Sequence, residues 1–172
     1  MKFIINKPDN YSDIVYTPED VCIKLIQHFK PTGLILEPAA GDGAFYKNLP
    51  EPKDWCEIEQ GRDFFDYTQK VDWVMTNPPW SILRKFLQHS MSISDNVCFL
   101  IPVYHLWTKA RLRDMKAAGF GIKEICLFNT PKNFPQLGFA IAMCHLQKDW
   151  EGDIKLTRLE EDIQMTQGVS HP

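Results

Sequence analysis

The sequence predicts an α/β fold, in which a mostly parallel β-sheet is covered by helices on both faces. Short apolar runs at residues 34–36, 71–76 and 97–101 have the length and composition of buried strands. Segments with the apolar spacing of amphipathic helices alternate with these runs, which is the arrangement that parallel sheets require. A glycine-bearing turn at Gly41-Asp42-Gly43 follows the first run, as expected where a strand passes into a helix.

The first helix is expected to begin at Thr17 and Pro18. The hydroxyl of Thr17 can cap the helix, Pro18 suits its first position, and the acidic residues that follow complement the helix dipole. Apolar residues then mark one face at helical spacing, namely Val21, Leu25, Ile26 and Phe29. The helix should end before Pro31 and Gly33.

The remaining elements follow from the same patterns. Strands are expected at residues 34–36, 54–59, 71–76, 97–101, 122–128 and 139–145, and helices at residues 44–49, 81–90 and 105–118. The segment 149–172 is polar and acidic, and we expect it to form a tail. The chain has 172 residues, of which 44% are hydrophobic, so residues 1–172 suit a single domain.

Composition predicts a cytoplasmic protein without a membrane partner. No apolar run approaches the roughly 20 residues needed to span a bilayer, and the N-terminal segment is too short for a signal peptide. The five cysteines lack paired metal-ligand spacing, so we expect buried, reduced thiols. The histidines form no ligand spacing either, and no metal site is predicted.

Charge is distributed unevenly along the chain. The formal net charge is −3, but residues 81–132 carry eight lysines and arginines against three acidic residues. The cations of this basic segment, among them Lys109 and Arg111, are candidates for contacts with the phosphates of a nucleic acid. The alternative is that they lie on solvated helix faces.

The motif Asn77-Pro78-Pro79-Trp80, directly after the expected strand 71–76, is the most informative feature of the chain. An amine conjugated to a ring or a carbonyl is a poor nucleophile, because its lone pair is delocalised. The side-chain carbonyl of Asn77 and the main-chain carbonyl of Pro78 can accept hydrogen bonds from both N–H groups, and two prolines restrict the backbone. Trp80 offers a flat face for stacking a ring. The motif therefore predicts methyl transfer onto a planar amino nitrogen.

A second motif surrounds the glycine turn. Gly41 and Gly43, with the small residue Ala39 before them, let the backbone approach a cofactor closely, although an ordinary turn is the alternative. The carboxylate of Glu37 suits a ligand with an ammonium group better than one with a pyrophosphate. No Walker-type Gly-Lys-Ser/Thr is present, which disfavours nucleoside triphosphate hydrolysis.

Acidic residues follow near the end of the next expected strand. Glu57 lies where a carboxylate can accept hydrogen bonds from ribose hydroxyls, and Glu59 competes for that role. Asp63 beside Phe64 can bind an adenine amino group while the aromatic ring packs against the base. The alternative for each is a solvated acid at a strand end.

Together these residues resemble the class I S-adenosylmethionine-dependent methyltransferases, in particular the amino-methylating DNA adenine enzymes, whose cofactor region precedes the catalytic tetrapeptide. The likeness covers residues 16–146. It implies a Rossmann-like fold whose last strand is antiparallel. Between Glu57 and Asp63 there is no room for the helix and strand that usually separate these positions, so we expect a pared-down sheet.

The resemblance implies S-adenosyl-L-methionine as the cofactor. The residues implied at its methionine part are Thr17, Pro18, Glu37, Ala39, Gly41 and Gly43. Those implied at its ribose and adenine are Glu57, Ile58, Asp63 and Phe64. Those implied at the target base are Asn77, Pro78, Pro79, Trp80 and, from a later loop, Phe134. Lys109 and Arg111 are added as candidate substrate contacts from the charge distribution alone.

The implied reaction is methylation of adenine N6 in DNA, on a base that is flipped out of the duplex or already single-stranded. DNA is favoured over RNA as the partner. Because no residues remain for a target-recognition domain, specificity is expected to come from short loops, from a partner subunit or homodimer, or to be low. RNA adenine and a protein glutamine amide are alternative targets, since both present a planar nitrogen. A module that binds nucleic acid without catalysis is a further alternative.

Overall fold

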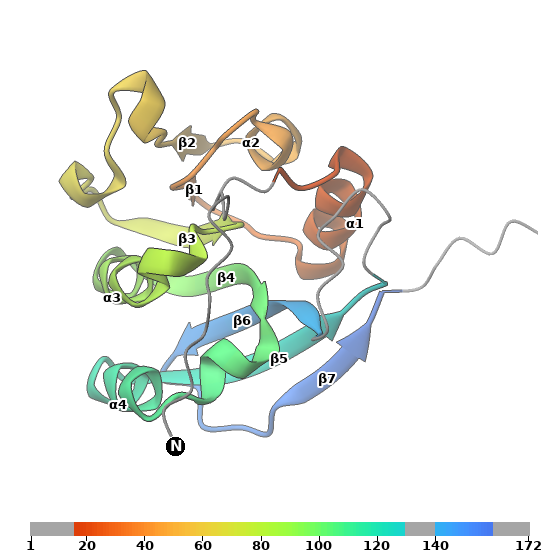
Figure 1. Ribbon diagram of the computed structural model, residues 1–172, viewed down its shortest axis with the longest axis vertical. Coiled ribbons are helices and arrows are strands. Elements are labelled where there is room, and N and C mark those ends of the chain that lie inside the picture. Colours follow the sequence, from red (N-terminus) through yellow and green to blue (C-terminus); the bar gives the residue numbers. More distant parts are fainter. Residues whose placement is uncertain (1–15, 130–139, 160–172) are drawn as a thin grey trace, which may run out of the picture.

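The computed structural model describes residues 16–129 and 140–159, which form a central sheet flanked by helices (Figure 1). The strands in this part of the chain are β1 (Ile35–Glu37), β2 (Lys53–Trp55), β3 (Val71–Thr76), β4 (Ser94–Pro102), β5 (Phe120–Leu127), β6 (Ile141–Lys148) and β7 (Lys155–Arg158). Their order in the sheet is β2-β1-β3-β4-β6-β5-β7. The fold is therefore α/β, as the alternating sequence patterns predict.

The first four strands run parallel to one another, whereas β6 runs antiparallel to both β4 and β5. β7 pairs in parallel with β5. A mostly parallel sheet with one reversed strand confirms the predicted fold class. The chain winds outward in opposite directions from β1 and β3, so the carboxyl ends of these two strands meet at the switch point of the sheet. Ligands bind at such a point in open α/β sheets.

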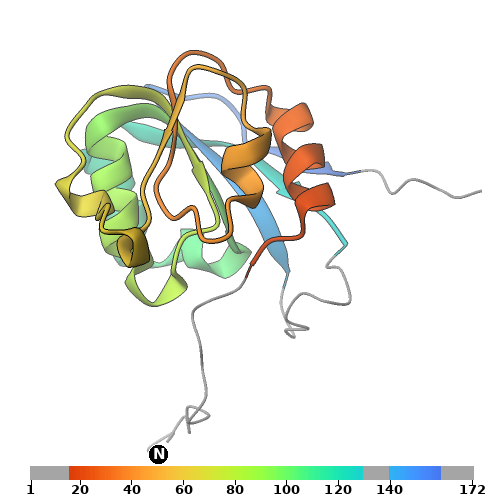
Figure 2. The same ribbon diagram turned by 90° about the horizontal axis from the view of Figure 1, so that it is seen from above.

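Helices cover both faces of the sheet (Figure 2). α1 (Glu19–Phe29) and α2 (Ala44–Asn48) lie on one face, and α3 (Leu83–Ile93) and α4 (Lys109–Ala117) lie on the other. Side chains of β4 alternate between two cores: Val97 and Phe99 pack with α3, and Cys98 and Leu100 pack with α1. Burial on both faces explains why this strand is apolar throughout.

The connection from β2 to β3 contains only two short 3-10 helices, η1 (Ile58–Gln60) and η2 (Phe64–Asp66). No further strand or α-helix occurs there, since all of its residues are described. The sheet consequently ends at β2, which agrees with the expected pared-down architecture. Two other 3-10 helices, η3 (Trp80–Ile82) and η4 (Val103–Trp107), follow β3 and β4.

The prediction that Thr17 caps the first helix is wrong. Pro18 occupies the N-cap position, and its carbonyl accepts from the amides of Val21 and Cys22 at 3.1 Å each. The Thr17 side chain is buried and points elsewhere, where its Oγ1 accepts a hydrogen bond from Asn77 Nδ2 at 3.2 Å. The Thr-Pro pair therefore connects the start of α1 to the tetrapeptide.

Most predicted elements differ from the structure by up to three residues at an end, and two are cut short by a new turn. The strand expected at residues 54–59 ends at Trp55, because the carboxylate of Glu57 accepts from the amide of Glu59 and starts the η1 turn. The helix expected at residues 105–118 is divided at Thr108, whose hydroxyl caps α4 by accepting from the amide of Arg111 at 3.5 Å. The residues before it form η4 instead.

Residues 155–158, expected to belong to a polar tail, form the edge strand β7. The buried carboxylate of Glu124 on β5 explains this strand, because Thr157 Oγ1 donates to Glu124 Oε1 at 2.6 Å and Lys155 Nζ lies 3.8 Å from the same oxygen. His28 Nε2 lies 2.6 Å from it as well. Burial would raise the pKa of Glu124, but the bonds to Thr157 and His28 outweigh it and lower that pKa.

The same cluster brings metal-ligating atoms together. The ligating atoms of His28, Glu124 and Cys126 lie within 4.8 Å of one another. However, Lys155 and Thr157 already surround the shared carboxylate oxygen, and a lysine ammonium repels a cation. We therefore interpret the cluster as a hydrogen-bonded network that fastens β7 and α1 to β5.

The cysteines agree with the prediction of buried thiols. All five are free and buried. Burial raises the pKa of Cys56 to about 11 and that of Cys144 to about 12, so these thiols stay protonated and unreactive near neutral pH. Cys56 lies just after β2 rather than in a strand. Within residues 16–129 and 140–159, no helix has the length and apolar character needed to cross a bilayer.

Candidate active site

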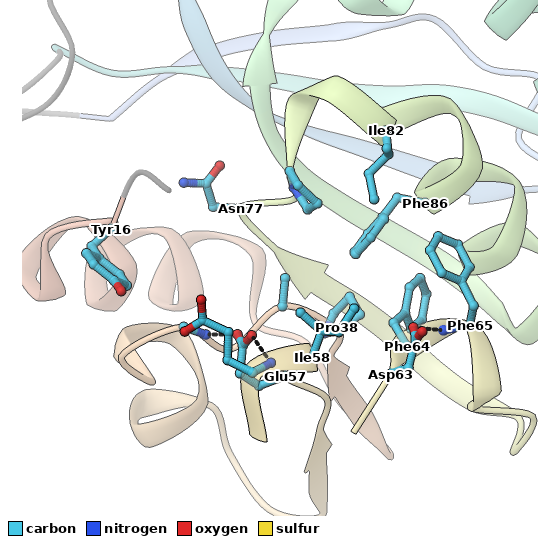
Figure 3. Close-up of a pocket in the computed structure, with 14 residues that line it drawn as sticks. Tyr16, Pro38, Glu57, Ile58, Asp63, Phe64, Phe65, Asn77, Ile82 and Phe86 are labelled. Carbon is cyan, nitrogen blue, oxygen red and sulfur yellow. Dashed lines mark hydrogen bonds between the residues drawn. The ribbon is translucent and has the colours of Figure 1, made fainter. Parts of the chain in front are cut away.

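A cavity of about 240 Å³ opens at the carboxyl edge of β1 and β3 (Figure 3). Its walls come from the glycine turn, from η1 and η2, and from the segment that follows β3. The residues that line it are Tyr16, Pro38, Ala39, Gly41, Glu57, Ile58, Glu59, Asp63, Phe64, Phe65, Asn77, Pro79, Ile82 and Phe86. The fold thus brings Asn77 into one cavity with most of the residues predicted to hold a cofactor.

The glycine turn forms one wall of the cavity. Gly41 has φ +52° and Gly43 has φ +84°, conformations that residues with a side chain rarely adopt. A Cβ atom at Gly41 would lie 3.2 Å from Cε1 of Tyr16, tighter than an ordinary contact. Gly41 lines the cavity, whereas Gly43 does not. The turn is fastened to the next loop because the amide of Ala40 donates to Cys56 O at 2.9 Å.

The carboxylate of Glu57 holds two loops together at the cavity floor. Its Oε2 accepts from the amide of Gly41 at 2.6 Å, and its Oε1 accepts from the amide of Glu59 at 3.2 Å. These bonds fix the carboxylate while each oxygen keeps the capacity to accept a further hydrogen bond from a ligand hydroxyl. Glu59 also lines the cavity, so the structure leaves both predicted candidates for the ribose contact at the site.

An apolar slot lies at the other end of the cavity. The ring of Phe64 packs against that of Phe86 with centroids 4.8 Å apart, and the ring of Phe65 lies 5.5 Å from the same partner. Ile58 is exposed at the mouth of this slot, and Figure 3 shows it between Glu57 and the phenylalanines. Asp63 Oδ1 accepts from the amide of Phe65 at 2.9 Å, which fixes this carboxylate at the slot's rim. A flat ring with a polar edge fits such a slot.

Asn77 enters the cavity from the end of β3. Its Nδ2 donates to Thr17 Oγ1, and this bond orients the amide by assigning the nitrogen to the Thr17 side. Among the other tetrapeptide residues, Pro79 lines the cavity and Pro78 is buried. The hydrogen bond to buried Thr17 therefore orients the side-chain amide of Asn77, and the two prolines that follow restrict the backbone next to it.

Trp80 lies beside the cavity rather than in its lining. The indole Nε1 donates to Leu100 O of β4 at 3.2 Å, and the half-buried ring packs against both cores. This contact fixes the end of the tetrapeptide to the neighbouring strand. The sequence pattern predicts stacking for Trp80 but does not predict these contacts with β4 and the two cores.

Glu37 is a buried carboxyl group behind the cavity wall. It is 2% exposed, and its Oε2 has no hydrogen-bond partner among the described residues. Burial raises the pKa of Glu37 to about 9, against a smaller lowering by a backbone hydrogen bond from Tyr46. The group is consequently protonated at neutral pH in the absence of a cation, and a cationic ligand group nearby would favour its ionised form.

A second hollow of about 250 Å³ adjoins the cavity and shares Tyr16 with it. It is lined by Thr17 and Pro18 at the start of α1, and by Asp42 and Lys47 around α2. Six of the ten predicted cofactor residues line the cavity, Thr17 and Pro18 line the second hollow, and Glu37 and Gly43 line neither. The second hollow, which contains Thr17 and Pro18 at the start of α1, also has the charged side chains of Glu19, Asp42 and Lys47 in its lining.

Three residues predicted at the target lie apart from the cavity. Lys109 is exposed on α4. Arg111 is half-buried, and its Nη1 donates to His105 O at 3.1 Å and to Thr108 Oγ1 at 3.3 Å, so the guanidinium braces the corner between η4 and α4. Phe134 lies outside the described residues.

The sequence patterns do not predict five of the residues that line the cavity, namely Tyr16, Pro38, Phe65, Ile82 and Phe86. Phe86 and Ile82 belong to the apolar pattern of the 81–90 segment, which on its own predicts a packed helix face. Phe65 directly follows the Asp63-Phe64 pair, so the aromatic doublet Phe64-Phe65 is a pattern from which its place in the cavity could have been predicted. Tyr16 precedes the Thr-Pro pair and carries no pattern of its own.

The arrangement of strands, with a reversed strand next to the last parallel one, defines the class I S-adenosylmethionine-dependent methyltransferase fold. The chain is similar to such a methyltransferase from Listeria monocytogenes, with a TM-score of 0.60 and 13% identity over 83% of this chain and 64% of that one. No protein-family model and no curated protein matches the sequence.

Two further solved structures share the fold. A Pyrococcus horikoshii protein described as an RNA methyltransferase has a TM-score of 0.59 and 15% identity, over 86% of this chain and 91% of that one. A modification subunit of a type I restriction enzyme from Vibrio vulnificus has a TM-score of 0.62 and 16% identity, over 88% of this chain. The chain spans 48% of that subunit, about half its length.

Proposed function

We propose that this protein is an S-adenosylmethionine-dependent methyltransferase that acts on the exocyclic amino group of adenine in DNA. The observation that carries the proposal is the position of Asn77. Its amide shares one cavity with Gly41 and Glu57, the residues expected to hold the cofactor. A methyl donor and a planar amine have to meet in one site, and this cavity contains features suited to both.

Properties of the cavity fit the proposed cofactor. The Glu37 carboxyl, with one oxygen lacking a partner in the described structure, is suited to stabilise the ammonium group of the methionine part. Glu57 is suited to the ribose hydroxyls, and Asp63 with Phe64 to the adenine edge and ring. When bound, S-adenosylmethionine supplies an electrophilic methyl group on a sulfonium, so the protein itself needs no covalent nucleophile.

The protein's part in the reaction is to orient and activate the amine. Asn77 Oδ1 and the main-chain carbonyl of Pro78 would accept hydrogen bonds from the two N–H groups, which restores electron density to the nitrogen. Thr17 would support this role because its bond to Asn77 Nδ2 fixes the orientation of the side-chain amide. Proximity and alignment supply much of the remaining rate.

An adenine in DNA is the proposed target for two reasons. The tetrapeptide with an aromatic fourth residue suits a ring that stacks, and we propose Trp80 as that stacking surface, anchored through Leu100 O. The Vibrio vulnificus neighbour is a modification subunit of a restriction enzyme, whereas the Pyrococcus neighbour is described as acting on RNA. RNA adenine is therefore the second candidate.

The proposal extends to the setting of the enzyme. We propose that residues 1–172 form a single methyltransferase domain and that sequence specificity comes from loops, a partner subunit or a second copy. Buried, reduced cysteines are compatible with the proposed cytoplasmic location.

The test is incubation of the protein with methyl-labelled S-adenosylmethionine and, separately, single-stranded DNA, duplex DNA, RNA and a glutamine-containing peptide. Nucleosides or amino acids are then analysed by mass spectrometry. We expect labelled N6-methyladenine from DNA. Label in RNA adenine alone would move the proposal to the second candidate, and label in glutamine alone would contradict a nucleic-acid target. No label in any substrate, despite cofactor binding, would contradict the enzymatic function.

A further inference from the structure

Two aromatic rings of η4 are exposed without lining the cavity. Tyr104 is 51% and Trp107 is 47% exposed, whereas four other exposed apolar residues, Tyr16, Ile58, Phe65 and Ile82, are accounted for by the cavity walls. A tryptophan with half of its surface in water leaves a large apolar area unburied, which is typical of contact surfaces.

The 3-10 geometry places these two residues on one face of η4, where the ring of Tyr104 also packs against that of His105 with centroids 4.4 Å apart. Residues three apart eclipse one another in a 3-10 helix, at a separation of about 6 Å given a rise of about 2 Å per residue. Val103 is half-buried and Leu106 is buried against the core, and Tyr104 and Trp107 lie on the exposed face about 120° around the helix from them. The base of this pair is braced, because Val103 N donates to Ala140 O at 3.0 Å. Arg111 holds His105 O from the other side.

The pair lies at the same edge of the sheet as the tetrapeptide. β3 and β4 are parallel neighbours, with Thr76 in register with Phe99, and η4 follows directly after β4 ends at Pro102. The bond from Trp80 Nε1 to Leu100 O joins the two segments. In Figure 2 the yellow-green η3 and the green η4 lie at one end of the sheet. The aromatic pair and the tetrapeptide therefore lie at the same edge of the sheet, on segments joined by a hydrogen bond.

Cations continue the surface along the next helix. Lys109, Arg113 and Lys116 are exposed and recur at the spacing of one helical face. The acidic residue of α4, Asp114, is turned toward α3, where it accepts from Arg84 Nε at 2.6 Å and from Gln88 Nε2 at 3.0 Å. The ion pair with Arg84 lowers the pKa of Asp114. The exposed side of α4 is therefore positive next to the aromatic pair.

We propose that Tyr104 and Trp107 form a stacking platform for bases that flank the target nucleotide, and that Lys109 and Arg113 contact the phosphates of the same strand. This inference rests on the proposed function, because it assigns the path of its nucleic-acid substrate. Aromatic rings beside cations are the combination by which proteins hold single-stranded nucleic acid. In this proposal Lys109 contacts a phosphate, whereas Arg111 supports the corner between η4 and α4 and does not contact the nucleic acid.

The test measures binding of a fluorescein-labelled, single-stranded DNA 12-mer by fluorescence anisotropy at two salt concentrations. Trp107→Ala should weaken binding about 10-fold or more, and Trp107→Phe should retain most of the affinity, since a base still stacks on the phenyl ring. Lys109→Ala should lower the slope of log affinity against log salt by about 0.7. Leu156→Ala, at a 67% exposed apolar residue on β7, is the matched control and should bind like the wild type.

The outcomes separate this inference from the proposed function. Affinity for S-adenosylmethionine, measured by calorimetry, should be the same in all variants, which excludes unfolding as the cause of a loss. Equal DNA binding by wild type and Trp107→Ala, with methylation of that DNA intact, would overturn the platform and leave the function standing. Trp107-dependent binding without methyl transfer would uphold the platform and count against the function. A Trp107-dependent dimer with unchanged DNA binding would overturn the platform in favour of a second copy.

Discussion

The buried carboxyl of Glu37 gives the protein a distinctive pH dependence of stability. Burial raises its pKa to about 9 in the folded protein, against 4.5 for an ordinary glutamate. Between these values the native state holds a proton that the unfolded state has released. Raising the pH therefore destabilises the native state by about 1.4 kcal/mol per pH unit, up to the native pKa. From pH 5.5 to pH 7.5 this amounts to about 3 kcal/mol.

Glu37→Gln removes this titration. The amide of glutamine also lacks a partner for one polar atom, but that cost does not change with pH. We expect the unfolding free energy of the cofactor-free wild type to fall by about 3 kcal/mol relative to Glu37→Gln over that range. The assay is urea unfolding, followed by circular dichroism at several pH values. The exposed residue Glu51 supplies the control, because Glu51→Gln should run parallel to the wild type.

Parallel curves for wild type and Glu37→Gln would refute the reasoning, since the carboxyl would then be ionised in the native state. The same variant should bind S-adenosylmethionine about 10-fold or more weakly at pH 7.5, because an amide cannot ionise against an ammonium group. Calorimetry measures this loss. Unchanged affinity would remove Glu37 from the proposed cofactor site.

Other predictions follow from single contacts. Gly41→Ala should lower stability by about 1–2 kcal/mol, because alanine disfavours φ +52° and its Cβ would crowd Tyr16; an unchanged urea midpoint would contradict this. Thr17→Val should reduce kcat more than cofactor affinity, because Asn77 loses the hydroxyl that orients its amide; equal losses in kinetics and calorimetry would contradict that role. Glu124→Gln should cost about 1–3 kcal/mol and speed amide exchange at residues 155–158, and unchanged exchange would show that β7 does not depend on this carboxylate.

The elements that the sequence predicts well are those with a local signal. The strand expected at residues 71–76 is β3, Val71–Thr76, because apolar residues that fill a central strand leave a continuous run. The glycine turn lies where expected, since its positive φ values need glycine. Both signals are contained within a few residues.

The features that the sequence could not supply depend on distant partners. β7 exists because Lys155 and Thr157 meet Glu124, about thirty residues earlier in the chain, while the segment itself is merely polar. Thr17 looks like a helix cap, and only the fold brings it to Asn77. Arg111 likewise resembles a free cation until the corner at Thr108 is known. A polar side chain such as that of Thr17 or Arg111 can make several different hydrogen bonds, and which one it makes depends on the partners that the tertiary structure brings to it.

The most direct test of the account is the behaviour of Asn77→Ala. Its rate of N6-methyladenine formation on single-stranded DNA should fall by at least about 100-fold, as for removal of an oriented polar group that acts on the transition state. Its calorimetric affinity for S-adenosylmethionine should stay within about threefold of the wild type, because the amide faces the target amine rather than the cofactor. Retention of most of the methylation activity by Asn77→Ala would contradict the central claim that this residue activates the amine.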